Sequence, residues 1–133
     1  MIIINDYAYS KLKKDGSVMV MKDHRRKLTG NIERVYLNTT NNKNPPIARA
    51  KVYLVYGEIE NEPQPLIRIM EKYYPFSGYS TSRIWYINYL EQLLGKQTKV
   101  KESYLYEVKA TYIYEIDDVK VSIPIVRRKE NPK

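Results

Sequence analysis

A long run of alternating residues near the C-terminal end of this 133-residue sequence requires the chain to build a β-sheet. Within residues 104–116, every second position carries an aromatic or aliphatic side chain, namely Tyr104, Tyr106, Val108, Ala110, Tyr112, Tyr114 and Ile116. Successive side chains of a strand point to opposite faces, so this period of two predicts a strand with one face on a core. A strand of this length needs long neighbours, which the rest of the chain must supply.

Four further segments are predicted as strands because they are rich in apolar and β-branched residues. These are residues 17–22, 32–38, 47–59 and, after a turn at Asp117-Asp118, residues 119–126. Pro124 places the last of them at the edge of the sheet or near the end of a strand. The residues expected on one face of segment 47–59 are Ala48, Ala50, Val52, Leu54 and Tyr56.

Three segments have the spacing and the boundary residues of helices. Residues 7–14 follow a capping Asp6 and precede Gly16, which suits a left-handed helix end. Residues 65–74 begin with a proline and stop before another proline. Residues 83–94 precede Gly95, and their expected apolar stripe is Ile84, Ile87, Leu90 and Leu94.

The predicted order is therefore helix, three strands, two helices and two strands. It indicates an α+β fold in which a small, mostly antiparallel sheet curls into a β-barrel with two or three flanking helices. The length suits one domain, which we assign to residues 1–126. Residues 127–133 carry four cations and one acid and are predicted to form a basic flexible tail.

Several classes of site are excluded by composition. The chain has no cysteine, so it forms no disulfide and no thiolate metal site. His24 is the sole histidine, whereas zinc sites usually take three or four ligands. No phosphate-binding loop or dinucleotide motif is present, so we expect no cofactor and no metal. No apolar run approaches the ~20 residues of a membrane span, which predicts a cytoplasmic protein with no membrane partner.

The net charge of +8 and the isoelectric point of about 9.5 favour a polyanionic partner such as nucleic acid. The charge could instead serve solubility alone. Its densest cluster lies in a predicted turn between two strands, where arginine forks would suit phosphate groups. The turn could equally be no more than solvated. The candidate phosphate contacts are Lys22, Arg25, Arg26, Lys27 and Arg34.

The sequence has 14 tyrosines, and most of them fit packing on a sheet face. Tyr79 stands apart in a loop of Gly, Ser and Thr, which makes it a candidate for stacking on an unpaired base. Trp85 is a second candidate, although a tryptophan at a helix start is more often a core anchor than a base stacker. Glu58 and Glu60 alternate on a strand, which is typical of a solvated face but would also suit a general base.

Residues 5–116 resemble the ASCH domains, a family of PUA-like β-barrels. The resemblance is carried by the helix ending in Gly16, the strand ending in Lys22, the basic turn up to Gly30, the Arg34-Val35-Tyr36-Leu37 strand and the small-residue strand from Ile47. It implies a cleft beside the first helix and a role in RNA binding or RNA-linked regulation. Some members resemble amidohydrolases of acylated cytidines that use a lysine two residues after the glycine. Val18 stands there in this sequence.

Our leading hypothesis is a nucleic-acid-binding module, RNA favoured over DNA, with a basic cleft between the first helix and residues 22–34. One alternative is a small amidohydrolase acting on modified nucleosides, with Glu58 or Glu60 as the base. Another is a protein-protein interaction module of a virus or mobile element, whose tyrosine-rich faces form a homodimer or block a host factor. The composition, rich in Lys, Ile and Tyr and free of Cys, favours a source in a hot environment, and we expect a thermophilic archaeon or its virus.

Overall fold

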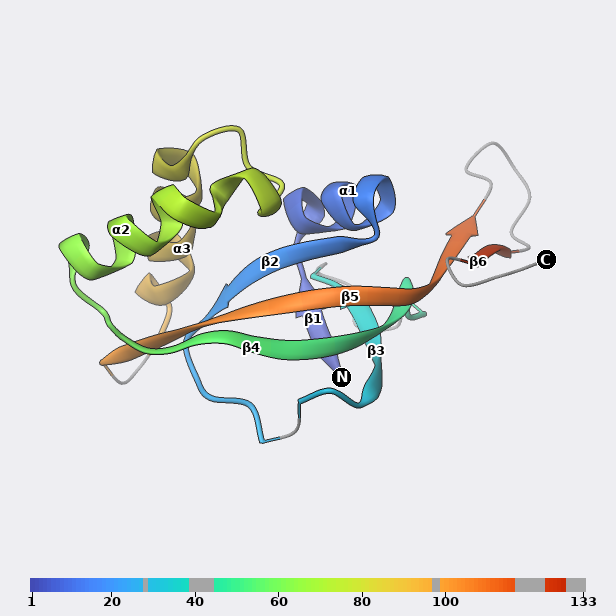
Figure 1. Cartoon of the computed structure of the whole chain (residues 1–133), viewed down its shortest axis with the longest axis horizontal. Coiled ribbons are helices and arrows are strands. Elements are labelled where there is room, and N and C mark those ends of the chain that lie inside the picture. The colour runs from blue at the N-terminus through green and yellow to red at the C-terminus, as the bar shows by residue number, and fades with distance from the viewer. Residues whose placement is uncertain (28, 39–44, 97–98, 117–123, 129–133) are drawn as a thin grey trace.

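The computed structural model describes residues 1–27, 29–38, 45–96, 99–116 and 124–128, and within them the chain forms six strands, three α-helices and one 3-10 helix (Figure 1). In chain order these are β1 (Ile2–Ile4), α1 (Asp6–Asp15), β2 (Ser17–Lys22), β3 (Ile32–Leu37), β4 (Ala48–Glu60), α2 (Pro63–Tyr73), η1 (Tyr74–Phe76), α3 (Ser82–Leu94), β5 (Glu102–Ile116) and β6 (Pro124–Arg128). The sequence does not predict β1, because three residues are too few to show a period.

The strands form one mixed sheet in the order β1-β3-β4-β5-β2. The β1–β3 pair is parallel, and the other pairs are antiparallel. β2 pairs with the first part of β5 and β6 with its last part, so both lie along the same side of β5. The predicted α+β class and the mostly antiparallel sheet are confirmed.

A closed barrel is not confirmed. Among the described residues the sheet is open, with β1 at one edge and β2 at the other. β6 reaches Arg128, so the first two residues of the predicted tail pair with β5, and residues 129–133 lie outside the described ranges. None of the helices in those ranges is long and apolar enough to cross a membrane.

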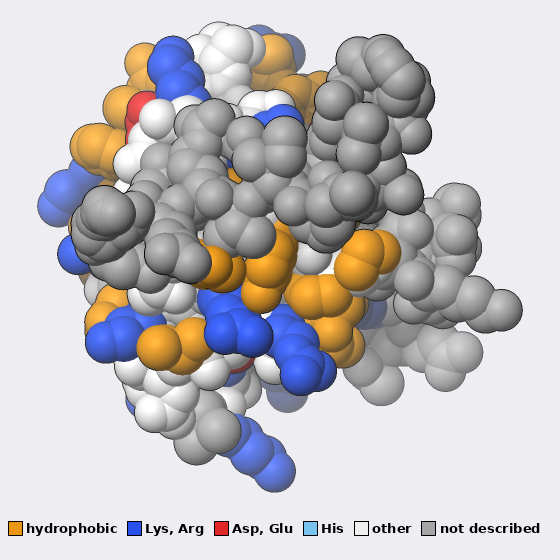
Figure 2. Space-filling model, turned by 90° about the vertical axis from the view of Figure 1, so that its right-hand side faces the viewer, with side chains coloured by type: hydrophobic (Ala, Val, Ile, Leu, Met, Phe, Trp, Pro, Cys, Tyr) orange, Lys and Arg blue, Asp and Glu red, His pale blue; other side chains and the backbone are white. Residues whose placement is uncertain are grey.

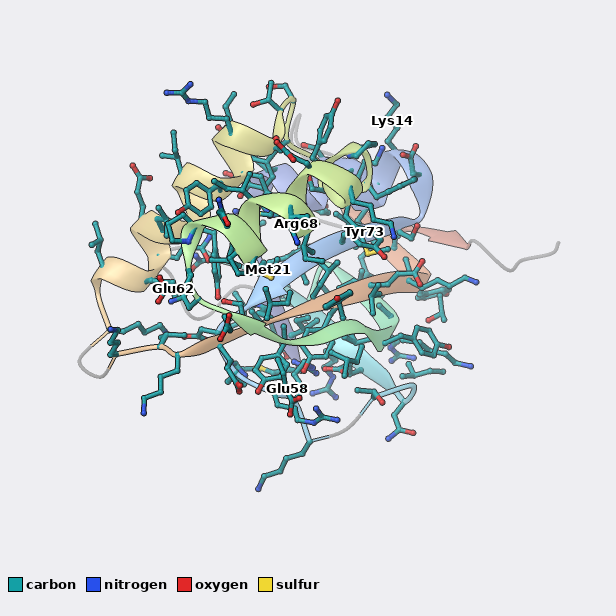
Figure 3. All side chains as sticks on the ribbon, turned by 60° about the vertical axis from the view of Figure 1, so that its left-hand side comes forward. Lys14, Met21, Glu58, Glu62, Arg68 and Tyr73 are labelled. Atoms are coloured by element: carbon teal, nitrogen blue, oxygen red, sulfur yellow. The ribbon has the colours of Figure 1, made fainter. Side chains whose placement is uncertain are left out.

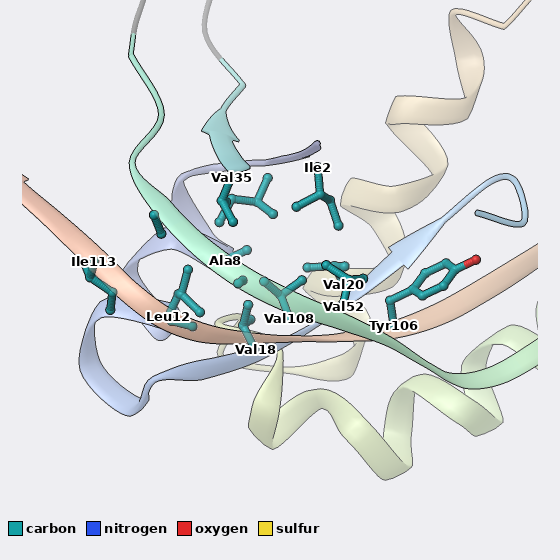
Figure 4. Packing of buried hydrophobic residues seen from close by; sticks show 14 of the residues in the cluster. Ile2, Ala8, Leu12, Val18, Val20, Val35, Val52, Tyr106, Val108 and Ile113 are labelled. Atoms are coloured by element: carbon teal, nitrogen blue, oxygen red, sulfur yellow. The ribbon is translucent and has the colours of Figure 1, made fainter. Parts of the chain in front are cut away.

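The main core lies between the curled sheet and α1 (Figure 4). Ala8 and Leu12 of α1 are buried there, as their spacing predicts. Gly16 ends the helix with a φ of 84° and donates its N–H to the Leu12 carbonyl oxygen at 2.8 Å. The predicted cap is displaced by one position. Asn5 accepts the hydrogen bond from the Ala8 N–H, and Asp6 is already helical.

A second core lies on the other face of the sheet, where α2 and α3 cover Met21, Ile59 and Leu105. The predicted stripe of α3 is wrong, because Ile84 and Ile87 are exposed and the helix buries Trp85 and Tyr89 instead. Both faces of α3 carry apolar residues, and the two aromatic rings bury the larger area. Figure 1 shows α2 and α3 together at one end of the sheet.

Irregularities in β4 and β5 change which side chains are buried. The register shifts between Arg49 and Ala50, so that Ile113 is buried and Tyr112 is only half-buried. Two further shifts in β4 leave Tyr56 exposed, although its parity predicts a core position. An extra residue in one strand reverses the alternation beyond it, which sequence parity does not reveal.

Candidate functional site

The two edge strands of the open sheet face one another across a cavity of about 180 Å³. β1 and β2 line it together with α1, the loop after η1 and the inner face of α3. The polar and aromatic side chains on its wall include Asn5, Lys22, Tyr79, Trp85, Tyr89 and Gln92. The cavity is therefore a mixed aromatic, amide and amine site between the two edge strands of the sheet.

Lys22, at the end of β2, reaches across this gap. Its Nζ donates a 2.7 Å hydrogen bond to the carbonyl oxygen of Ile3 in β1. Burial, reinforced by the positive charge of Arg26, lowers the pKa of Lys22 from its ordinary 10.5 to about 8. The amine thus releases its proton far more readily than a surface lysine does.

Tyr79 forms the aromatic wall together with its neighbours. Its ring stacks on Tyr7 with 4.4 Å between centroids and lies 6.3 Å from the ring of Trp85. Its hydroxyl accepts a 2.7 Å hydrogen bond from the Asn5 amide and donates one of 2.9 Å to Asn88. Burial raises the pKa of the Tyr79 hydroxyl, so the hydroxyl stays protonated and the side chain neutral. These contacts fix the orientation of the ring.

The loop that carries Tyr79 is held tightly against α1. Gly78 has a φ of +89°, and a Cβ added there would lie 2.2 Å from the carbonyl oxygen of Tyr7. The Ser77 hydroxyl accepts from the Tyr79 N–H at 3.1 Å and donates to the Tyr74 carbonyl oxygen at 2.7 Å. Only glycine fits this close approach, which explains the residue that precedes Tyr79.

A wider groove of about 540 Å³ lies beside the cavity. Its walls are the turn after β2 and the segment that leads from α3 to β5. The Asp23 carboxylate joins the two walls, since it lies 2.8 Å from His24 Nδ1 and 2.9 Å from Lys96 Nζ. Burial alone would raise the pKa of Asp23, but these two hydrogen bonds lower it below its ordinary value. The basic residues of the groove are His24, Arg25, Lys96, Lys99 and Lys101.

The predicted site residues divide among five places, one of which, the interior of the protein, is occupied by Arg26. Lys22, Tyr79 and Trp85 meet in the cavity, although they come from three separate segments. Arg25 lines the groove, and Lys27 is exposed in the turn. Arg34 is exposed on β3, opposite Arg49 of β4.

Arg26 is engaged inside the protein. Its guanidinium donates to the Glu33 carboxylate and, at 3.2 Å, to the carbonyl oxygen of Met1. Its backbone N–H donates to the Tyr106 hydroxyl at 2.6 Å. The Arg26 and Glu33 side chains are 14% and 11% exposed, so this ion pair fastens the turn to the core.

Sequence reasoning missed Asn5, Tyr89 and Gln92, whose approach to the cavity depends on tertiary packing. It also missed Lys96, Lys99 and Lys101, a basic run that directly follows the helix-ending Gly95 and is visible in the sequence. Glu58 and Glu60 are exposed and do not line the cavity. Glu58 lies on the side of β4 away from α2 (Figure 3). Within the described ranges, no group of three or more His, Cys, Asp or Glu residues could hold a metal ion.

Comparisons of the chain with protein-family models, with curated proteins and with solved structures give no match.

Proposed function

We propose that this protein binds RNA, with one unpaired base in the cavity between β1 and β2 and the adjoining phosphates in the groove. The observation that carries the proposal is the position of Lys22 and Asp23. These consecutive residues line the cavity and the groove respectively, so a ligand could occupy both at once.

The cavity suits a single planar ring system. Its volume of about 180 Å³ lies below the ~300–1,000 Å³ of sites for drug-sized ligands. Aromatic faces favour stacking, and amide groups favour hydrogen bonds to base edges. Tyr79 and Trp85 supply the rings, and Gln92 supplies an amide. Lys22 would donate to a carbonyl or ring nitrogen of the base.

The groove suits phosphates because its basic residues outnumber its acidic ones. Arg25, Lys96, Lys99 and Lys101 face two carboxylates, Asp23 and Glu102. Asp23 is already shared between His24 and Lys96. Among the described residues, Arg25, Lys99 and Lys101 form no ion pair. Single-stranded nucleic acid is held by the same combination of basic groove and aromatic surface.

We also propose that the fold is of the PUA-like kind, with its barrel left open between β1 and β2. The order of β2, β3, β4 and β5 after a glycine-ended helix supports this, as does the cavity beside α1. In this view the open seam is the ligand site. The Lys22–Ile3 hydrogen bond joins the two strands where ladder pairing is missing.

The function is tested by the salt dependence of RNA affinity. In Lys99→Ala/Lys101→Ala, the log–log slope should flatten by about 0.7 for each phosphate that the variant no longer neutralises. Arg68→Ala/Lys72→Ala is the matched control, since it removes two exposed cations from α2, where Figure 3 shows Arg68. The control should keep the wild-type slope. If both variants keep that slope, or both flatten it equally, the groove assignment is wrong.

A further inference from the structure

The outer face of the sheet carries a group of cations beyond the part that α2 and α3 cover. On β4, Arg49 and Lys51 alternate with Ala48, Ala50 and Val52, all of which are fully buried. The side chains of Arg49 and Lys51 therefore point away from the core. Exposed Arg34 on β3 and exposed Lys109 on β5 share this face, because they lie opposite Arg49 and Lys51.

The register sets like charges directly against each other. Arg34 pairs with Arg49, and Lys51 pairs with Lys109. Directly opposite residues have Cβ atoms only about 4.5–5.5 Å apart, and like charges in these positions destabilise a sheet. Among the described residues, no ion pair involves any of the four. Fold stability therefore gives no reason for this arrangement.

Among the described residues, acidic side chains on this face offset the four cations only in part. In the described register, Glu107 is the acidic residue of the same parity on β5, and it lies opposite Tyr53. Tyr53 and Ile32 are exposed beside the cations. Figure 2 views one end of the molecule, where the coloured side chains include Lys and Arg among hydrophobic ones and few acidic ones. A sheet face with this excess of positive charge is complementary to a polyanion.

We propose that Arg34, Arg49, Lys51 and Lys109 form a second contact surface that binds the phosphate backbone of nucleic acid without regard to sequence. The inference takes its ligand class from the proposed function but concerns a different face. Strands lie about 4.8 Å apart and alternate residues about 6.7 Å apart. At this spacing the four cations can contact successive phosphates. The negative charge of the phosphates then offsets the repulsion between the paired cations.

This sheet face is distinct from the cavity and groove. Glu102 of the groove and Lys109 of the sheet face are separated along β5 by roughly 23 Å, at about 3.3 Å per residue. A short RNA that fills the cavity and groove would not reach the sheet face. A longer RNA could contact both, so the two surfaces can be separated by ligand length.

The test compares Lys51→Gln/Lys109→Gln with Arg68→Gln/Lys72→Gln, which makes the same change in net charge on α2. Affinities for a short and a long single-stranded RNA are measured against salt concentration. For the sheet-face variant, the affinity for long RNA should fall by roughly tenfold at low salt, and the slope should flatten by about 0.7 for each phosphate that is no longer neutralised. Short-RNA affinity should stay at the wild-type value, and the thermal midpoint should not fall.

An unchanged long-RNA slope overturns the inference, as does an equal flattening in the α2 control. Loss of binding to vesicles of anionic lipid with RNA binding intact would also overturn it, because the face would then serve a membrane. If the sheet-face variant alters RNA binding while Lys99→Ala/Lys101→Ala does not, the groove assignment fails and this inference stands. If Lys99→Ala/Lys101→Ala alters RNA binding while the sheet-face variant does not, the groove assignment stands and this inference fails.

Discussion

Lys22 Nζ and the carbonyl oxygen of Ile3 form a 2.7 Å hydrogen bond between two edge strands that have no ladder with each other. Edge strands present unpaired backbone groups, and here a side chain satisfies one of them. The same contact holds an amine with a pKa of about 8 at the wall of the cavity. Lys22 thus both joins the edge strands β1 and β2 and contributes an amine to the cavity.

The lowered pKa of Lys22 predicts a pH dependence of stability. Between its folded value of about 8 and its ordinary value of 10.5, the unfolded chain binds more protons than the folded protein. The free energy of unfolding therefore rises with pH, by about 2 kcal/mol from about pH 7.5 to about pH 9.5. Denaturant unfolding at the two pH values measures the rise.

Lys22→Met is the control for this prediction, because it keeps a long side chain but cannot titrate. Its free energy of unfolding should lack the rise of about 2 kcal/mol attributed to the amine. Burial also raises the pKa values of Tyr79 and Tyr89 from the ordinary tyrosine value of 10.0. These shifts change the free energy of unfolding mainly above about pH 10, outside the range in which Lys22 is tested. The same rise in wild type and Lys22→Met would contradict the assignment to Lys22.

Gly78→Ala should destabilise the protein by at least about 3 kcal/mol, because it combines a left-handed backbone with a clash against Tyr7. Gly95→Ala is the matched control. Gly95 has a φ of −84°, and a Cβ there would meet nothing within 4 Å. That change should alter stability by no more than about 1 kcal/mol. Thermal or denaturant unfolding distinguishes them, and similar effects of the two substitutions would refute the docking of this loop on α1.

Arg26→Ala should cost about 1–3 kcal/mol of unfolding free energy, because the Glu33 carboxylate, 11% exposed, then keeps only the Met1 ammonium at 3.2 Å as its partner. Arg25→Ala, which changes an exposed neighbour, should stay within about 0.5 kcal/mol. Chemical denaturation gives both values. Equal stability of the two variants would mean that the Arg26–Glu33 ion pair does not stabilise the packing of this turn.

Much of the fold follows from local sequence. The left-handed glycine after α1 and the alternation from Tyr104 to Ala110 predict elements that the structure contains. Parity fails where bulges occur, as at Tyr56, and on α3, where both faces are apolar. In these places tertiary packing decides which side chains are buried, and local period carries no information about it.

The sequence predicts several of the residues in the candidate site but not how they come together in space. Charge and a tyrosine in a polar loop direct attention to Lys22, Arg25 and Tyr79, which line the cavity or the groove. The ion pair of Arg26 with Glu33, seven residues further along the chain, and the burial of both side chains depend on how the turn packs. The sheet-face cations emerge only when the register sets Arg34 against Arg49.

The most direct measurement of the central claim uses Trp85, the single tryptophan of the chain, which lines the cavity. Its fluorescence is followed while a short single-stranded RNA is added, and binding is monitored in parallel by anisotropy of a labelled RNA. A base entering the cavity should quench Trp85 saturably with the affinity given by anisotropy. An abasic ribose-phosphate chain should bind without that quenching. RNA that binds by anisotropy while Trp85 fluorescence stays constant would contradict the account.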